Sequence, residues 1–359
     1  MADDILLAKI HDLSDLELAA LICLIAQEHC IIYADLDTVN DVVQELQLIA
    51  AKVFGLTHAV VHCSEHTTLD EFAHAILSVD ENLSRSTTPI RTRQDSYFIQ
   101  NPAFQSIARS PVPDSLAFDN KSIASVLILK NFDEAPLQVQ IQALEMIRTK
   151  RLFTRTSVHS APKQFLLMAL VAGRGGPRLT KHLNEHMFIS HFHDSEDGFP
   201  NLDETDSDTE SSSSVVKKSY TKEVLPLPAI SVEDIDQLAH LSDQMTFNME
   251  VKQYMLNIIS FLRLHRAVGG GITPAATQHF EKLAKLLGTI HGLTFVTPSL
   301  VALASRKVYL HRIQIARPEN DRSMQWGSDL NIVKEILDGV FPEDVIEDVL
   351  GLAGPEVPL

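Results

Sequence analysis

Four histidines within a twelve-residue stretch could bind a metal ion. His182 and His186 are four residues apart, so on a helix they would share one face, as zinc ligands can. His191 and His193 would lie on one side of a strand. The stretch lacks a His-Glu-x-x-His motif, however, and its histidines straddle an expected helix-to-strand junction. We therefore favour hydrogen-bonded or interface histidines and keep a metal site as the alternative.

A glycine-rich loop at residues 173–178 is the second candidate, with the sequence Gly-Arg-Gly-Gly-Pro-Arg. The backbone N–H groups of such a loop can bind an anion. Arg174, Arg178 and Lys181 would supply the positive charge for a phosphate. The simpler interpretation, which we favour, is a flexible loop at the edge of a sheet.

Other patterns for catalysis or nucleic-acid binding are absent from the sequence. It contains no Gly-x-x-x-x-Gly-Lys-Ser/Thr phosphate loop and no Gly-x-Ser-x-Gly nucleophile motif. A formal charge of −17 over 359 residues argues against binding nucleic acid or an anionic membrane. Its three cysteines lie in apolar segments, which fits a reducing compartment. We expect a cytoplasmic or nuclear protein that needs no cofactor.

Short apolar strands alternate with helices in the first half of the chain. Four apolar runs have the length of buried strands: residues 29–33, 59–63, 125–129 and 165–171. Three segments repeat apolar residues at helical spacing: residues 14–27, 38–54 and 136–150. Ser14 and Glu17 form a capping box at the first of these helices. Apolar strands separated by helices predict an α/β domain whose parallel sheet is covered on both faces.

The composition then changes once. Residues 194–210 contain eight acidic and no basic residues, and four serines follow. Such a segment cannot bury enough apolar surface to fold, so we predict a disordered linker, in which Ser207 and Thr209 could be phosphorylated. Helical periodicity returns in six segments: residues 232–241, 248–265, 273–291, 298–314, 329–340 and 342–352. The predicted parts are an α/β core (1–200), the linker (201–226), a helical domain (227–315) and a helical extension (316–359).

Several segments resemble, in collinear order, AAA+ ATPases of the MoxR and magnesium-chelatase I-subunit type. Residues 125–136 read Ser-Val-Leu-Ile-Leu-Lys-Asn-Phe-Asp-Glu-Ala-Pro and are similar to the Walker B strand and its following turn. Residues 21–33 look like the helix and strand before the phosphate loop, and residues 165–188 resemble the sensor strand and arginine-finger region. Residues 271–276 and 295–312 resemble the lid. The resemblance implies an AAA+-like parallel sheet flanked by helices, plus an all-helical MoxR/magnesium-chelatase-type lid domain.

The phosphate-loop positions of that family are not retained. At this place the chain reads Ala34-Asp-Leu-Asp-Thr-Val-Asn-Asp41, without glycine or lysine. Asn40 would stand in place of the lysine and Asp41 in place of the magnesium-binding hydroxyl, while Asp35 adds another acid. Two like charges about 4 Å apart cost several kcal/mol at a protein surface. We therefore expect the segment to repel ATP.

The remaining catalytic positions of the family are also lost. Lys130 and Asn131 stand at the two Walker B acids. The sensor strand lacks the family's asparagine, the arginine-finger region has neither arginine nor lysine, and the lid's sensor arginine falls on Ala275. Because phosphoryl transfer depends on positioning and charge neutralisation, these losses argue against ATP hydrolysis.

The sequence thus predicts a non-catalytic AAA+-like scaffold or regulatory subunit. Its partners would be proteins, among them active members of the same family, and not nucleic acid or membrane. One alternative is an active ATPase that uses ATP and Mg²⁺ for magnesium-chelatase-type metal insertion or chaperone-like remodelling, with an unorthodox phosphate site on Arg174 and Arg178. A second alternative is a metal- or anion-sensing module. The sequence leaves the oligomeric state open.

Overall fold

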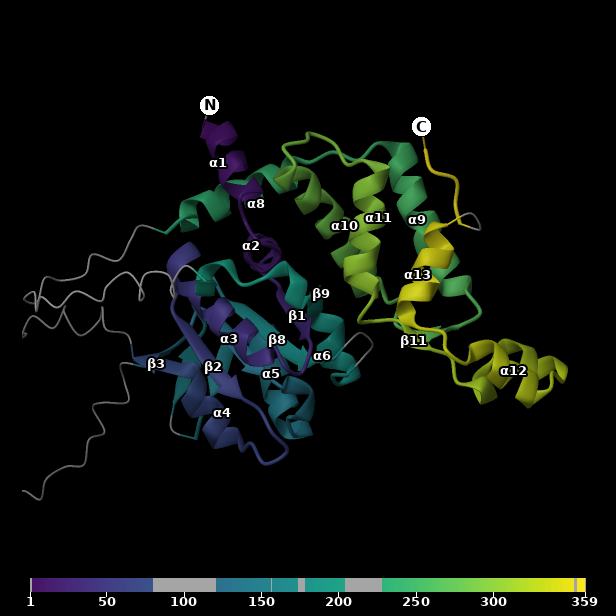
Figure 1. Cartoon of the computed structure of the whole chain (residues 1–359), viewed down its shortest axis with the longest axis horizontal. Coiled ribbons are helices and arrows are strands. Elements are labelled where there is room, and N and C mark those ends of the chain that lie inside the picture. Colours follow the sequence, from purple (N-terminus) through teal and green to yellow (C-terminus); the bar gives the residue numbers. More distant parts are fainter. Residues whose placement is uncertain are drawn as a thin grey trace, which may run out of the picture.

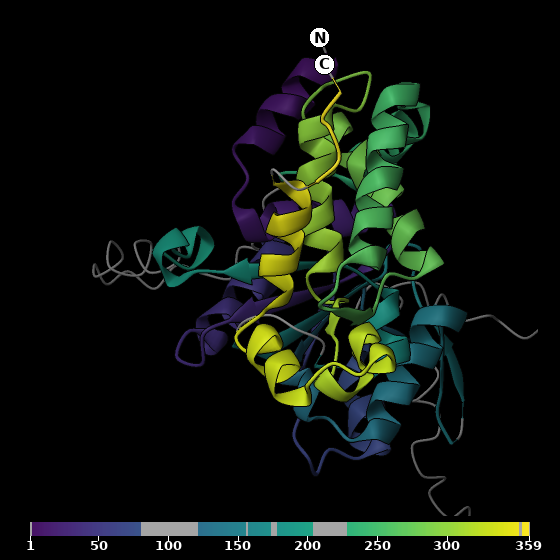
Figure 2. The same cartoon turned by 90° about the vertical axis from the view of Figure 1, so that its right-hand side faces the viewer.

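The computed structural model describes residues 2–79, 121–155, 157–173, 178–203, 228–351 and 354–358 (Figure 1). The described residues up to 203 form a sheet domain, and those from 228 onward form a helical domain. Figures 1 and 2 show the helices of the second domain packed beside the sheet. Among the described residues, none of the helices combines the length and the apolar character that crossing a bilayer requires.

Five parallel strands form the centre of the sheet domain: β1 (His29–Ala34), β2 (His58–His62), β5 (Val126–Lys130), β8 (Leu166–Ala172) and β9 (Met187–His193). Their order is β2-β5-β8-β1-β9, and each neighbouring pair runs parallel. The four predicted strands are confirmed to within one residue at each end. The central strands β5, β8 and β1 are buried almost throughout, which explains why they read as continuous apolar runs.

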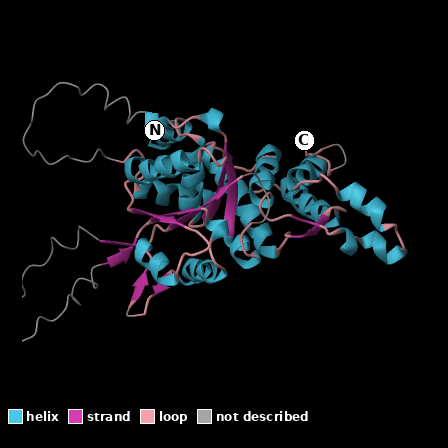
Figure 3. Ribbon diagram, turned by 60° about the horizontal axis from the view of Figure 1, so that its bottom comes forward, coloured by secondary structure: helices cyan, strands magenta, loops and turns pink. Residues whose placement is uncertain are grey.

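Helices cover both faces of the sheet (Figure 3). The five main ones are α2 (Asp15–Ala26), α3 (Val39–Leu48), α4 (Leu69–Ile76), α5 (Leu137–Thr149) and α6 (Lys181–His186). Cys30 and Ile32 of β1 belong to the apolar cluster of α2 and α3, whereas Ile31 and Tyr33 belong to that of α4, α5 and α6. This division follows from strand geometry, because successive side chains point to opposite faces.

One predicted helix begins where the sequence indicated, and another differs from its prediction in form. Helix α2 begins at the predicted capping box, in which Ser14 Oγ accepts from the Glu17 N–H and Glu17 Oε2 accepts from the Ser14 N–H. The predicted helix at residues 38–54 is instead α3 followed by a π-helical turn, η1 (Ile49–Val53).

Smaller elements complete the sheet domain. They are the 3₁₀ turns η3 (Phe132–Glu134) and η4 (Ser195–Asp197), and two antiparallel strand pairs, β3 (Leu77–Val79) with β4 (Lys121–Ile123) and β6 (Arg151–Phe153) with β7 (Val158–Ser160). Helix α1 (Ala2–His11) instead contacts the helical domain, where Lys9 Nζ donates to the carbonyl oxygen of Ala229 at 3.1 Å. The sequence analysis predicted neither α1 nor α4.

The helical domain contains all six predicted helices. These are α8 (Val232–Gln244), α9 (Met249–Leu264), α10 (Pro274–Ile290), α11 (Pro298–Tyr309), α12 (Leu330–Leu337) and α13 (Pro342–Leu350). Strands β10 (Val268–Gly270) and β11 (Gln314–Ile315) pair antiparallel, and the turns η5 (Pro318–Asn320) and η6 (Arg322–Trp326) precede α12. Helix α11 ends five residues before its predicted end at residue 314.

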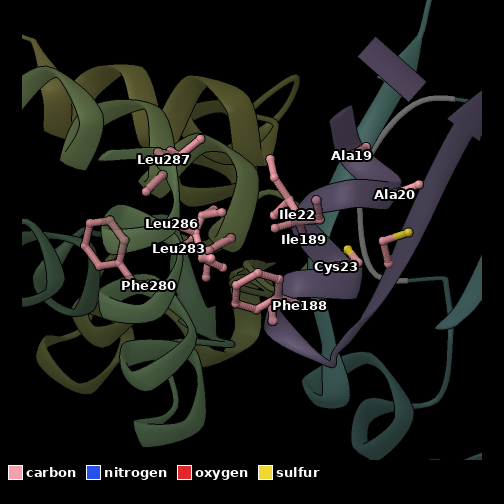
Figure 4. Packing of buried hydrophobic residues seen from close by; sticks show 14 of the residues in the cluster. Ala19, Ala20, Ile22, Cys23, Phe188, Ile189, Phe280, Leu283, Leu286 and Leu287 are labelled. Carbon is pink, nitrogen blue, oxygen red and sulfur yellow. The ribbon is translucent and has the colours of Figure 1, made fainter. Parts of the chain in front are cut away.

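A single apolar cluster joins the two domains (Figure 4). Ile22 of α2 and Ile189 of β9 lie opposite Leu283 of α10 in this view, and all three are buried. Burying apolar side chains contributes about 25 cal/mol per Å² of area removed from water. The position of the helical domain is therefore fixed by packing against α2 and β9.

Most of the predicted linker lies outside the described residues, including Ser207 and Thr209. Its first residues are nevertheless structured, because residues 200–203 are helical and Asn201 is buried. Asn201 Nδ2 donates at 2.8 Å both to Glu45 Oε1 of α3 and to Glu17 Oε1 of α2. These contacts place residues 201–203 in the sheet domain, which corrects the predicted start of the linker; the other domain boundaries stay predictions.

Candidate functional site

The segment aligned with the phosphate loop lies at the carboxyl edge of the sheet, where α/β proteins commonly bind ligands. Strand β1 ends at Ala34, the N–H of Thr38 donates to the carbonyl oxygen of Asp35 at 3.1 Å, and α3 begins one residue later. Leu36, in this turn, is 78% exposed. A short turn thus joins strand and helix, where phosphate binding requires a longer glycine-rich loop.

Two of the predicted positions are in direct contact. Lys130 Nζ donates a hydrogen bond to Asn40 Oδ1. Lys130 is the last residue of β5 and Asn40 lies in the first turn of α3. In the alignment implied by the resemblance to AAA+ ATPases, Lys130 stands where the family has an acidic metal-binding residue. Its partner Asn40 stands where the family has the phosphate-binding lysine. Since Mg²⁺ takes oxygen ligands, an ammonium group here opposes a bound divalent cation.

Three carboxylates lie near this contact in sequence. Asp35 and Asp41 are half-buried, whereas Asp37 is exposed. They flank the turn and the first helical residues, so the positive end of the α3 dipole already has acidic neighbours. An incoming triphosphate would meet these charges without a glycine-rich backbone cradle to offset them.

The chain beyond Lys130 turns sharply. Asn131 adopts a left-handed conformation with φ 52°, which an asparagine tolerates better than most residues. The turn η3 follows, and its Asp133 places Oδ2 3.7 Å from Arg178 Nη1. The same nitrogen donates to the carbonyl oxygen of Ala172 at 2.6 Å. Arg178 is therefore held by the end of β8 and by a carboxylate.

That the glycine-rich loop binds an anion stays a prediction. Arg174 lies outside the described residues, and Lys181 is exposed at the start of α6. A Cβ atom on Gly173 would lie 2.9 Å from Arg178 Nη2, so the Arg178 side chain folds back over the loop's first residue. The guanidinium group of Arg178, which we predicted as a phosphate contact, is therefore already in contact with this loop.

The metal-site prediction is not supported by the described residues, among which no group of three or more His, Cys, Asp or Glu could hold a metal ion. His182 and His186 lie on α6, the first exposed and the second half-buried. His191 and His193 are buried in β9. His191 Nδ1 lies 3.0 Å from Lys307 Nζ of α11, because β9 forms the edge of the sheet that faces the helical domain.

A buried arginine, Arg312, joins the two domains and was not predicted as a functional residue. Only 2% of it is exposed. Its Nη1 donates to the carbonyl oxygens of Val308 at 2.5 Å and of Phe188 at 3.4 Å, and its Nη2 donates to that of Met187. The Arg312 Nη2 also lies 2.6 Å from His279 Nδ1. One guanidinium thus binds backbone from β9 and α11 and a side chain from α10 at once.

Neighbouring polar groups strengthen the same contact. Asn184 Nδ2 donates to the carbonyl oxygen of His311 at 2.6 Å, and His311 Nε2 lies 3.1 Å from the carbonyl oxygen of Met187. The resemblance aligns residues 183–188, which include Asn184 and Met187, with the arginine-finger region. In this chain the segment is bound by its own helical domain. The adjacent His311 and Arg312 could have drawn attention to this contact in the sequence, but the sequence does not show which residues they bind.

Burial lowers the pKa of several interface histidines. The pKa of His279 is lowered to about 3, mainly by burial and then by Arg312. The pKa of His191 is lowered to about 3 by burial and then by Lys307. Burial likewise holds the pKa of His311 well below its usual value. These rings are neutral in the folded protein at physiological pH.

The interface should therefore lose stability in mild acid. Between about pH 6.5 and pH 3 the unfolded chain binds protons at these histidines and the folded chain does not, so the free energy of unfolding falls as the pH falls. We expect about 1 kcal/mol per buried histidine between pH 7.5 and 5.5. Urea denaturation at both pH values would measure it. His279→Gln should reduce the pH dependence and the exposed control His240→Gln should not; equal slopes would contradict the assignment.

The helical domain matches a known family. The AAA lid domain family matches residues 260–335, from α9 to α12. A solved structure of a Cytophaga hutchinsonii protein proposed to be an ATPase superposes with a TM-score of 0.55, covering 93% of this chain and 92% of that protein at 11% identity. The fold is of the AAA+ type. At this identity the superposition concerns architecture alone, and the MoxR/magnesium-chelatase subtype stays a prediction.

Two fungal relatives share sequence with parts of the chain. The Saccharomyces cerevisiae protein called maintenance of telomere capping protein 2 is 34% identical over 109 residues, which are 29% of this chain and 30% of that protein. The protein of the same name from Lachancea thermotolerans is 27% identical over 146 residues, 35% of this chain and 51% of that protein. The matches thus span about a third to a half of these curated relatives.

Proposed function

We propose that this AAA+-type protein is a non-catalytic scaffold or regulatory subunit of the MoxR/magnesium-chelatase-like type that does not bind or hydrolyse ATP. The observation that carries the proposal is the hydrogen bond between Lys130 and Asn40. In an active site of this type the strand contributes a carboxylate for Mg²⁺ and the loop contributes a lysine for the phosphates. Here the charge on the strand is reversed and the loop residue is neutral.

The electrostatics support the same conclusion. A nucleotide triphosphate bound at the turn would meet Asp35, Asp37 and Asp41, and Mg²⁺ would meet the Lys130 ammonium group. Each component of Mg–ATP therefore meets a charge of its own sign, which costs several kcal/mol at protein-surface dielectric. The one described cation in contact with α3 here, the Lys130 ammonium group, already donates to Asn40 Oδ1.

The contact between the domains supports a fixed arrangement. In the family that the sequence resembles, nucleotide lies between core and lid, whereas here Arg312 binds the β9 backbone directly. A helical domain held by buried hydrogen bonds does not depend on nucleotide for its position.

The relatives suggest a cellular setting. Their shared name, maintenance of telomere capping protein 2, supports a nuclear role within a protein assembly. We propose proteins as the partners, active AAA+ proteins among them.

Nucleotide binding tests the proposal directly. We expect no saturable fluorescence change when a fluorescent ATP analogue and Mg²⁺ are titrated to high micromolar concentration, and no phosphate release above a blank, because neither charge of Mg–ATP is neutralised. Saturable binding would overturn the proposal. Loss of that binding in Arg178→Ala, but not in the surface control Arg306→Ala, would then favour the unorthodox phosphate site.

A further inference from the structure

Helix α12 carries an apolar stripe of which only one side is covered. Val333 and Leu337 are 1% and 8% exposed and pack into the helical domain. Ile332 and Ile336, each one residue earlier, are 56% and 46% exposed. One residue corresponds to 100° around a helix, so the two isoleucines extend the apolar face away from the covered side. A surface helix usually buries such a face completely.

Two aromatic residues flank this helix. Trp326 at the end of η6 is 88% exposed, and Phe341 just before α13 is 64% exposed. Figure 1 shows α12 projecting beyond the other helices of the domain, and in Figure 2 this projecting part faces the viewer. We call Trp326, Ile332, Ile336 and Phe341 together the α12 surface. Two large apolar side chains exposed on one helix, with an exposed aromatic residue beyond each of its ends, are typical of an interaction site.

The neighbouring helix α13 provides a comparison within the same chain. Val345, Ile346 and Val349 are 0–3% exposed, so its apolar stripe packs on its own domain. Helix α12 is as apolar along its stripe but has no equivalent cover among the described residues for Ile332 and Ile336.

Charge indicates which partner the surface would accept. Residues 326–348 contain seven acidic residues and a single basic one. Glu335 and Asp338 are exposed on and just after α12 itself, and Glu343 is exposed at the start of α13. An apolar strip within acidic surroundings complements a partner that is apolar along one side and basic along its margins.

We infer that the α12 surface docks a basic amphipathic helix of a partner protein. The helix would place its apolar residues on Ile332, Ile336 and the two aromatic rings, and its Lys and Arg side chains beside the acidic residues, as in helix-in-groove recognition. This inference rests on the scaffold function proposed above and deepens it, because it identifies the surface and the chemistry of the partner. Tryptophan is among the residues that most often dominate such contacts.

Trp326 provides the measurement, because it is the only tryptophan of the chain. The probe is a synthetic leucine–lysine peptide that forms an amphipathic helix and contains no tryptophan. We expect a saturable blue shift of the tryptophan emission as the peptide covers the ring. The double variant Ile332→Glu/Ile336→Glu should weaken binding at least about tenfold, because it removes two apolar contacts. A leucine–glutamate peptide of the same length should cause no shift.

A matched control distinguishes binding at the α12 surface from non-specific binding to other exposed apolar residues. Leu137 and Ile141 of α5 are 60% and 53% exposed and also four residues apart. Leu137→Glu/Ile141→Glu carries the same change in charge and should leave the affinity unchanged. Glu335→Lys tests the charge contribution without touching the apolar residues and should also weaken binding.

Three results would overturn the inference: no shift with the basic peptide, equal weakening in both double variants, or a blue shift that grows with protein concentration without peptide, which would indicate a second copy of the chain as occupant. None of these depends on nucleotide. A failed peptide titration without ATP binding would remove this surface but leave the scaffold function, whereas ATP binding would remove the scaffold function whatever the peptide does.

Discussion

Replacing Gly271 by alanine is expected to destabilise the protein by about 2–6 kcal/mol. The residue has φ +102°, and a Cβ atom built there would lie 1.9 Å from the carbonyl oxygen of Arg312. Non-glycine backbone in such a conformation costs about 1–3 kcal/mol, and relieving the overlap costs a further 1–3 kcal/mol or so. The carbonyl belongs to the turn between α11 and β11, so it cannot move without displacing the β10–β11 pair.

The measurement is the unfolding midpoint, followed by circular dichroism in urea. Gly327→Ala is the matched control, since Gly327 has φ +81° but no heavy atom within 4 Å of the added Cβ. We expect that variant to lose only about 1–2 kcal/mol from backbone strain. If the two alanine variants unfold at the same urea concentration, the close approach of Gly271 to Arg312 is wrong.

The sequence predicted the elements far better than their contacts. Strands β5 and β8 read as continuous apolar runs because both of their faces are buried, and the helices read clearly because one stripe of each is buried. Helix α4 was missed although Thr68 and Glu71 form a capping box at its start; length was not the reason, because α12 is also eight residues long and was predicted. Asn201 was placed in the linker because its acidic surroundings resemble a solvated chain, whereas hydrogen bonds to Glu17 and Glu45 hold it.

At the candidate site, residue types were predictable and pairings were not. The sequence shows a lysine at residue 130 and an asparagine at residue 40, but their hydrogen bond joins residues 90 positions apart. For the histidine cluster we favoured hydrogen-bonded or interface histidines over a metal site, and the contact of His191 with Lys307 fits that interpretation. Closeness along the chain suggested a common ligand, whereas the turn from α6 into β9 separates the exposed His182 from the buried His191 and His193.

Removing the Arg312 side chain should be nearly as damaging as filling the space beside Gly271. In Arg312→Ala the carbonyl oxygens of Met187, Phe188 and Val308 lose a buried donor. The carbonyl of Met187 keeps His311 Nε2 at 3.1 Å, whereas each buried carbonyl left without a donor costs about 1–3 kcal/mol, and a cavity remains where the side chain was. We expect a loss of about 3–5 kcal/mol in urea unfolding. Faster proteolysis should accompany it, because the guanidinium binds both domains.

The control for Arg312 is another arginine of the same domain. Arg306 forms two hydrogen bonds with Glu347, at 2.6 and 3.0 Å, but the side chains are 46% and 58% exposed. Exposed ion pairs contribute about 0–1 kcal/mol, so Arg306→Ala should change the midpoint little. The comparison separates burial from charge, because each variant removes one guanidinium. Similar midpoints for Arg306→Ala and Arg312→Ala would mean that apolar packing between α2, β9 and α10 alone holds the helical domain. Arg312 would then not be the link between the two domains that the nucleotide provides in the family that the sequence resembles.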